Sequence, residues 1–167
     1  MAAVVDLNGI KSTLKTLFDT ANTTTASPVD LSNNLTQRVK RVLTVNPEQI
    51  PPQASFFPFV TSYITAKSIG QDEIASTQLS AKRKSEISIE VVGAVFNQNQ
   101  TDVNKDPADT DINYLMENIE LVLRSDYNIS GKVKWQKPSD VQYYTSVLDA
   151  RNHIRAGILK LTAIVLY

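Results

Sequence analysis

Apolar positions in the last third of the chain follow two different periods. Between residues 109 and 125 they recur every third or fourth position, which predicts an amphipathic helix lying against another layer. Residues 153–167 instead carry apolar side chains on both alternating faces, a pattern typical of a strand inside a sheet or under a helix. We therefore expect Ile119 of the helix and Leu161 of the strand to lie in facing layers of one core.

Two shorter strands are predicted between this helix and the final strand. The first lies around Val133 and Trp135 and ends at Pro138, since proline cannot donate to a strand ladder. The second covers residues 141–148. Aromatic side chains in this part of the chain fit either a core or an interface patch, and both interpretations stay open here; they are Trp135, Tyr143 and Tyr144.

One more helix and three more strands are predicted in the first two thirds of the chain. The helix covers residues 6–20 and has Asp6 as its N-cap. The strands cover residues 38–45, 56–66 and 82–97, and a proline-rich turn separates the first two. A chain of 167 residues is long enough to form one domain, residues 1–167, around a core of its own.

Two polar stretches interrupt this pattern, at residues 67–81 and 98–108. They are long for structureless connections in a small domain, and such loops usually carry function. Because they hold few apolar anchors, we expect them to become ordered against a partner. The candidate interface residues lie in these loops and in the basic cluster that follows the first; they are Gln71, Asp72, Glu73, Lys82, Arg83, Lys84, Asp102 and Lys105.

Basic side chains gather at the beginning of two predicted strands, one group being Lys82, Arg83 and Lys84 and the other Arg38, Lys40 and Arg41. They fit a contact with phosphates or with an acidic partner. They also fit solvated strand ends, where charge discourages edge pairing. The neutral chain favours solvated ends over a grip on DNA, whereas a protein contact through the first group stays open.

The overall composition narrows the function classes. The formal net charge is zero and the pI is near 6.6, which disfavours a domain built to grip nucleic acid or a membrane surface. No apolar run has transmembrane length, and no basic and apolar leader opens the sequence. The absence of cysteine excludes disulfides, thiolate metal sites and cysteine nucleophiles.

Candidate chemistry is sparse. Asp102, Asn104 and Asp106 begin like a calcium loop, but Pro107 stands where that loop needs glycine and Asn113 where it needs glutamate. A solvated loop leading into a capped helix explains these acidic residues better.

His153 is the only histidine, so no second imidazole is available for a metal site. A serine triad with Asp140 or Asp149 lacks the glycine pattern of a nucleophile elbow. A structural, non-enzymatic protein is therefore expected, and a small α+β enzyme or ligand-binding domain using His153 and the acidic loop is the alternative.

The order of elements resembles that of the tail terminator, or tail completion, proteins of long-tailed bacteriophages. Four segments carry the resemblance: IPPQASFFPFV at residues 50–60, KRKSEISIEVVGAVF at 82–96, INYLMENIELVLRSDYNISGKV at 112–133 and RAGILKLTAIVLY at 155–167. It implies an α+β fold with a mixed, mostly antiparallel sheet flanked by two or more helices. It implies no catalytic, cofactor-binding or metal-binding residues.

The same resemblance implies a homohexameric ring that caps the finished tail tube, ends tail elongation and presents a docking face to the neck of the head. The implied partners are further copies of the chain, the tail tube protein, a neck or head-completion protein, and the sheath where the tail is contractile. DNA would pass through the ring without sequence-specific binding. The protein would be made in the host cytoplasm and reside at the tail–neck junction of the virion. Another head–tail joining protein is the alternative within this class.

Overall fold

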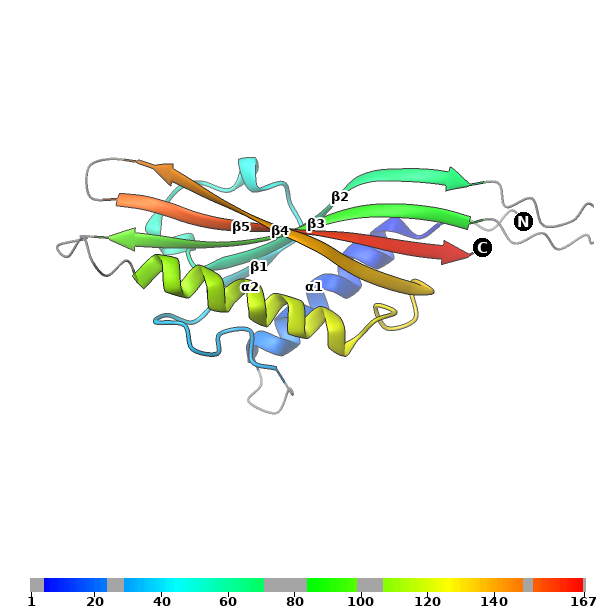
Figure 1. Cartoon of the computed structure of the whole chain (residues 1–167), viewed down its shortest axis with the longest axis horizontal. Helices are drawn as coiled ribbons and strands as arrows, with labels where there is room; N and C mark the ends of the chain where they lie inside the picture. Colours follow the sequence, from blue (N-terminus) through cyan, green and yellow to red (C-terminus); the bar gives the residue numbers. More distant parts are fainter. Residues whose placement is uncertain (1–4, 24–28, 71–83, 99–106, 149–151, 167) are drawn as a thin grey trace, which may run out of the picture.

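The computed structural model describes residues 5–23, 29–70, 84–98, 107–148 and 152–166. Its helices and strands are α1 (Leu7–Thr23), β1 (Arg41–Leu43), β2 (Phe59–Gly70), β3 (Lys84–Gln98), α2 (Pro107–Ser125), β4 (Trp135–Val147) and β5 (Asn152–Leu166). The proline-rich turn holds two single-turn 3-10 helices, Pro47–Gln49 and Ala54–Phe56. The predicted α+β fold is confirmed, with two helices beside one sheet (Figure 1).

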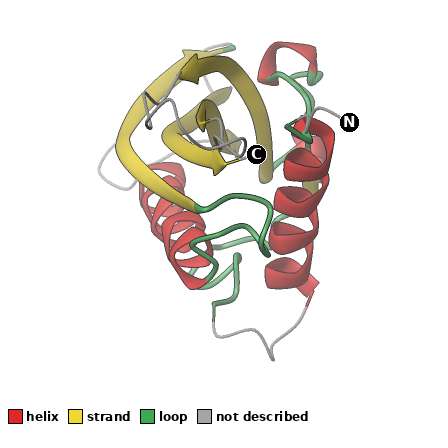
Figure 2. Cartoon of the chain, turned by 90° about the vertical axis from the view of Figure 1, so that its right-hand side faces the viewer, coloured by secondary structure: helices red, strands yellow, loops and turns green. Residues whose placement is uncertain are grey.

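The five strands form one mixed sheet in the order β1-β2-β3-β5-β4. Only β1 and β2 run parallel, and every other neighbouring pair is antiparallel. The last strand therefore lies between β3 and β4, which confirms the interior position that its two apolar faces predict. In Figure 2 the strands curl, and both helices lie outside the curl.

One large core fills the space between the helices and the sheet. Ile119 of α2 and Leu161 of β5 are both buried in it, as the sequence predicts. A second, smaller cluster covers one end of the opposite, open face of the sheet. Phe57, Phe59 and Ala94 are buried there beneath the proline-rich turn, which supplies Ile50 and Phe56.

Helix α1 begins where the sequence places its cap. The Gly9 amide donates to Asp6 Oδ1 at 2.8 Å, so the Asp6 carboxylate satisfies an N–H group of the first turn. A Cβ atom on residue 9 would stand 1.9 Å from the other carboxylate oxygen of Asp6. Glycine, although a poor helix former, thus keeps the cap in place.

Asn118 corrects the predicted polar face of α2. The helical pattern places it on the solvent side, but its side chain is buried and donates to two carbonyls of the segment before β1. Asn118 Nδ2 lies 2.8 Å from the Asn33 oxygen and 3.2 Å from the Leu31 oxygen. A polar residue at this position therefore anchors an irregular segment to the helix.

The two short strands predicted after α2 are one strand. β4 continues through Pro138 with a register shift between Pro138 and Val141, and it pairs with β5 along its length. Proline is tolerated because β4 is an edge strand, where a missing outward N–H group breaks no ladder bond. The prediction that Pro138 ends a strand was therefore wrong.

Three predicted boundaries also move. β2 continues to Gly70, so residues 67–70 belong to a strand and not to the first polar loop. α2 begins at Pro107, inside the predicted second loop. β1 is only Arg41–Leu43, much shorter than the predicted strand at residues 38–45. Because β1 is so short, most of β2 has no neighbour on that side among the described strands.

Candidate functional site

The outer edge of β4 is the most exposed regular element among the described residues. Trp135 is 40% exposed, Tyr143 53%, Tyr144 50% and Val147 72%. These aromatic side chains are therefore not part of the core, and an interface role for them stays a prediction. Within the described ranges, no strand pairs with β4 on the side away from β5.

The two halves of this edge differ in protection. The first half carries Lys137, Pro138 and the register shift, and the Gln136 amide is already bonded to the Tyr127 oxygen at 2.8 Å. Lysine, proline and bulges are the devices by which natural sheets block edge pairing. Residues 141–147, VQYYTSV, contain no charge, no proline and no glycine. This second half is an unguarded edge rich in strand-forming residues.

The direction of its hydrogen-bonding groups follows from the hairpin that closes β4 and β5. The Leu148 amide donates to the Asn152 oxygen at 2.9 Å. Because antiparallel pairs alternate, Ser146, Tyr144 and Gln142 bond toward β5. The N–H and C=O groups of Val141, Tyr143, Thr145 and Val147 therefore point outward, along the unguarded edge.

The surroundings of this edge are acidic. Loss of hydration and the carboxylates of Glu117, Asp109 and Glu120 raise the pKa of the Tyr143 hydroxyl. All three carboxylates belong to α2, so this helix presents negative charge beside β4. Arg155 of β5 offsets part of it, since its guanidinium lies 3.7 Å from Asp109 and also donates to the Thr145 hydroxyl.

A second unpaired edge lies on the opposite side of the sheet. β1 pairs with β2 only as far as Thr61, whose hydroxyl donates to the Val45 oxygen at 2.6 Å and accepts from the Val45 amide. Residues 63–70 of β2 have no described strand on that side. Ile69 is 63% exposed there, and Lys67 is the only charged residue of the strand.

The open face of the sheet carries a polar row between these edges. Tyr63 of β2 lies opposite Glu90 of β3, which lies opposite Lys160 of β5. The Tyr63 hydroxyl donates to the Glu90 carboxylate. Burial, and then this hydrogen bond, raise the pKa of Tyr63 well above its usual value. The row is thus a fixed structural contact, with Tyr63 protonated at neutral pH.

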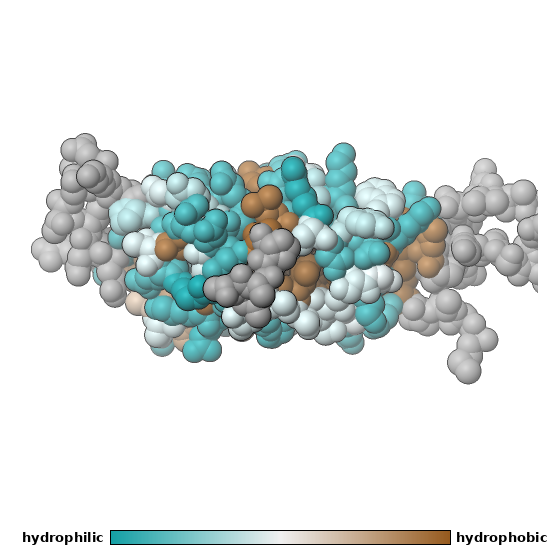
Figure 3. Space-filling view, turned by 90° about the horizontal axis from the view of Figure 1, so that it is seen from below, coloured by the Kyte–Doolittle hydropathy of each residue, from teal (hydrophilic) through white to brown (hydrophobic). Residues whose placement is uncertain are grey.

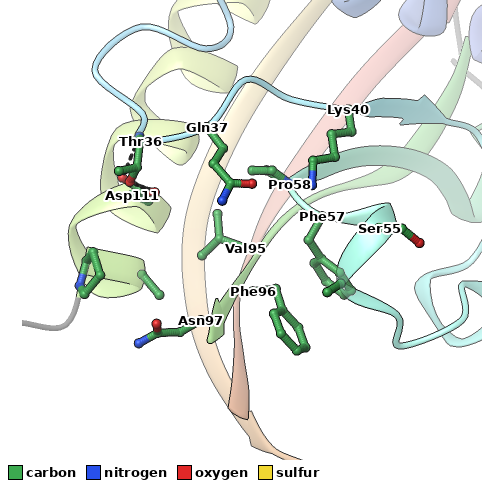
Figure 4. Close-up of a pocket in the computed structure, with 13 residues that line it drawn as sticks. Thr36, Gln37, Lys40, Ser55, Phe57, Pro58, Val95, Phe96, Asn97 and Asp111 are labelled. Carbon is green, nitrogen blue, oxygen red and sulfur yellow. Dashed lines mark hydrogen bonds between the residues drawn. The ribbon is translucent and has the colours of Figure 1, made fainter. Parts of the chain in front are cut away.

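A pocket of about 550 Å³ opens where the segment before β1, the proline-rich turn and the beginning of α2 meet (Figure 4). Phe57 and Phe96 form its apolar wall, and Gln37, Lys40 and Asn97 supply polar groups. Asp111 is held at its rim by the amide and the hydroxyl of Thr36. The pocket therefore combines an apolar wall with one lysine, one carboxylate and two side-chain amides.

The basic group before β1 is largely engaged inside the molecule. The Arg38 guanidinium lies 3.2 Å from the Asp30 carboxylate and 2.6 Å from the Asn22 oxygen. Arg41 lies over the Phe56 ring, 4.2 Å from its centre. Lys40, which lines the pocket, is exposed. These residues make local contacts and form no continuous basic surface among themselves.

Of the candidate interface residues, only Lys84 falls within the described ranges. It opens β3 on the open face, opposite Gly70 and Leu166. The others lie outside the described residues; they are Gln71, Asp72, Glu73, Lys82, Arg83, Asp102 and Lys105. Most of the predicted contact loops, residues 71–81 of the loop at 67–81 and residues 99–106 of the loop at 98–108, likewise lie outside them.

The described part of the chain does not bring together the residues that a metal site or a serine–histidine–aspartate triad would need. No group of three metal-ligating side chains is present there. His153 lies opposite Val147 in β4, while Asp140 stands seven residues away along the same strand, roughly 23 Å at the usual rise. Asp149 is not among the described residues. Asp109 and Asp111 are bonded to Arg155 and Thr36.

No family model matches the chain, and no curated protein matches it. Neither described helix combines the length and the apolar character needed to span a membrane. The helix side, seen from below in Figure 3, is mainly hydrophilic with small apolar patches. The sequence pattern alone does not single out the unguarded edge as a site, although its signal, the uncharged run VQYYTSV, is visible in the sequence.

Proposed function

We propose that this protein is a structural subunit of a virion that assembles into a homo-oligomeric ring, most simply a hexamer, on the finished tail tube. The observation that carries the proposal is that two edges on opposite sides of the sheet, β4 and the far half of β2, have no neighbouring strand among the described residues. Two different edges support head-to-tail contacts between copies, and such contacts generate rings when the rotation closes.

The order of elements supports the role of the ring. It resembles the order of elements in tail terminator proteins, which end tail elongation and dock the neck of the head. The ring would contact the tail tube protein on one side and a neck or head-completion protein on the other, at the tail–neck junction. The zero net charge suits a passage through which DNA moves without being gripped.

Electron microscopy of virus particles tests the role. We expect several copies arranged as a ring at the head–tail junction, and particles lacking the protein should show tails of uncontrolled length without heads. A single copy per particle, or density elsewhere than the junction, would refute the role. Gene neighbours encoding a tail tube, a tape measure and a portal protein would support it independently.

A further inference from the structure

We propose that two copies of this chain join strand to strand, with residues 141–147 of β4 in one copy paired to residues 63–70 of β2 in the next. This inference rests on the proposed self-assembly, and it identifies the two strands through which neighbouring copies would contact each other. The two free lengths match, because seven residues on one edge meet eight on the other. Main-chain hydrogen bonds would supply the adhesion, as they do wherever an extended segment adds to a sheet edge.

The direction of the strands suits this joint. β3 runs antiparallel to β2, β5 to β3 and β4 to β5, so β4 runs opposite to β2. A second copy in the same orientation would place its β2 antiparallel to β4, which continues the alternation. The free half of β4 and the free half of β2 lie at opposite ends of the sheet, so the neighbour is displaced along the strand direction (Figure 1). Each junction therefore repeats head to tail.

The charges near the two edges favour pairing of β4 with β2 of the next copy over pairing of β4 with β4. Tyr143 and Thr145 share the helix side of the sheet with Gly157 and Arg155, and acidic α2 lies beside them. Lys67 lies opposite buried Ile87, so it also projects to the helix side. The joint would bring Lys67 toward the carboxylates of α2. Pairing β4 with β4 of a second copy would instead bring two acidic helices together, which disfavours a two-fold dimer.

Introduced thiols test the joint directly, because the chain contains no cysteine. A full-length copy carrying Tyr143→Cys is mixed with one carrying Ile69→Cys, which lies opposite it on the same face in this joint, and oxidised. We expect disulfide-linked pairs to form at least about ten times faster than with a control copy carrying Ser12→Cys on α1. Each variant alone should react no faster than this control.

Two outcomes of the cross-linking would overturn the joint. One is equal rates with Ile69→Cys and with Ser12→Cys. The other is rapid self-linking of Tyr143→Cys, which would assign β4 to a two-fold contact between like edges.

A proline variant tests the joint in the assembled particle. Thr145→Pro removes one outward N–H group and leaves the β4 bonds to β5 in place, whereas Thr145→Ala keeps that N–H. Both variants lose the contact with Arg155, so Thr145→Ala is the matched control. We expect tails to be completed by Thr145→Ala and not by Thr145→Pro.

The results separate the joint from the function. Cross-linking in solution by a protein absent from the head–tail junction would leave the joint intact and refute the proposed function. A ring at the junction that Thr145→Pro still forms would uphold the function and overturn the joint.

Discussion

Gly93 of β3 and Gly157 of β5 lie directly opposite each other, and Met116 of α2 lies over both. A Cβ atom on Gly157 would stand 2.5 Å from Met116 Cγ, and one on Gly93 would stand 3.0 Å from Met116 Sδ. The paired glycines thus form a flat place in the sheet on which the helix rests at close distance.

Gly157→Ala should destabilise the fold because the new methyl group overlaps the Met116 side chain. We expect a loss of about 1–3 kcal/mol in the free energy of unfolding, and a smaller loss for Gly93→Ala. Urea unfolding measures both. Combining Gly157→Ala with Met116→Ala should cost less than the sum of the two single changes, and simple additivity would contradict the proposed contact.

The buried stripe of α2 makes Ile119→Ala costly. Ile119 is fully buried, so we expect a loss of about 2–5 kcal/mol in unfolding free energy. Leu121→Ala on the same helix is the control, since Leu121 is half exposed and should change stability by no more than about 0.5 kcal/mol. Equal effects of the two changes would show that α2 packs through another face.

Asn118→Ala should release the segment before β1 from α2. The change leaves the Leu31 and Asn33 carbonyls without their donor, and we expect it to cost about 1–3 kcal/mol. Asn113→Ala, at an exposed position of the same helix, is the matched control. Hydrogen exchange at residues 31–35 should rise in the first variant only, and unchanged exchange there would argue against the anchor.

Ionisation of Tyr63 should make the folded protein less stable at alkaline pH. In the unfolded chain a tyrosine ionises near pH 10, whereas burial and the bond to Glu90 raise the pKa of Tyr63 in the folded state. Above pH 10 the unfolded state therefore binds fewer protons, and the free energy of unfolding falls as pH rises. This contribution is fully present below pH 10.

Tyr63→Phe removes that titration. The stability difference between the native protein and this variant should shrink as pH rises from 9 to 11 in chemical denaturation. Tyr127→Phe, at an exposed tyrosine, corrects for the general effect of alkali. A difference that stays constant over this range would mean that Tyr63 ionises equally in both states.

Salt should weaken the proposed joint between copies. Lys67→Glu in the Ile69→Cys copy is expected to slow its cross-linking to the Tyr143→Cys copy, and Glu117→Lys in the Tyr143→Cys copy is expected to restore part of the rate. The two cysteine copies without charge reversal should cross-link more slowly as the sodium chloride concentration is raised, because exposed charges are screened. A rate independent of both salt and charge reversal would remove Lys67 from the joint.

The spacing of apolar residues in the sequence predicts the two elements on which the main core depends, helix α2 and strand β5. The spacing of Ile112, Leu115 and Ile119 identified α2, and the two apolar faces of the last strand identified an interior position. Both features could be predicted because buried positions are occupied by apolar residues, whose spacing is visible in the sequence. Asn118 escaped prediction because its partners are backbone carbonyls about 85 residues away, a distance over which no periodicity acts.

The candidate site was less predictable because it depends on neighbours. Pro138 appeared to end a strand, since whether a missing N–H matters depends on which side of the strand is paired. The same ignorance of strand order concealed the edge at Tyr143 and Thr145. Composition can show that a run lacks charge, but only the strand order shows that none of the described strands pairs with its outer side.

The place of β5 governs when this surface comes into being. β3 and β4 are not bonded to each other, and each pairs with β5, which follows both in the chain. During synthesis on the ribosome, β3 and β4 therefore cannot be joined until β5 has been made. The contacts between β3 and β5 span the longest sequence separations among the paired strands of the described fold. A nascent chain thus has no finished β4 edge to offer, and the delay separates folding of the subunit from its association with other copies.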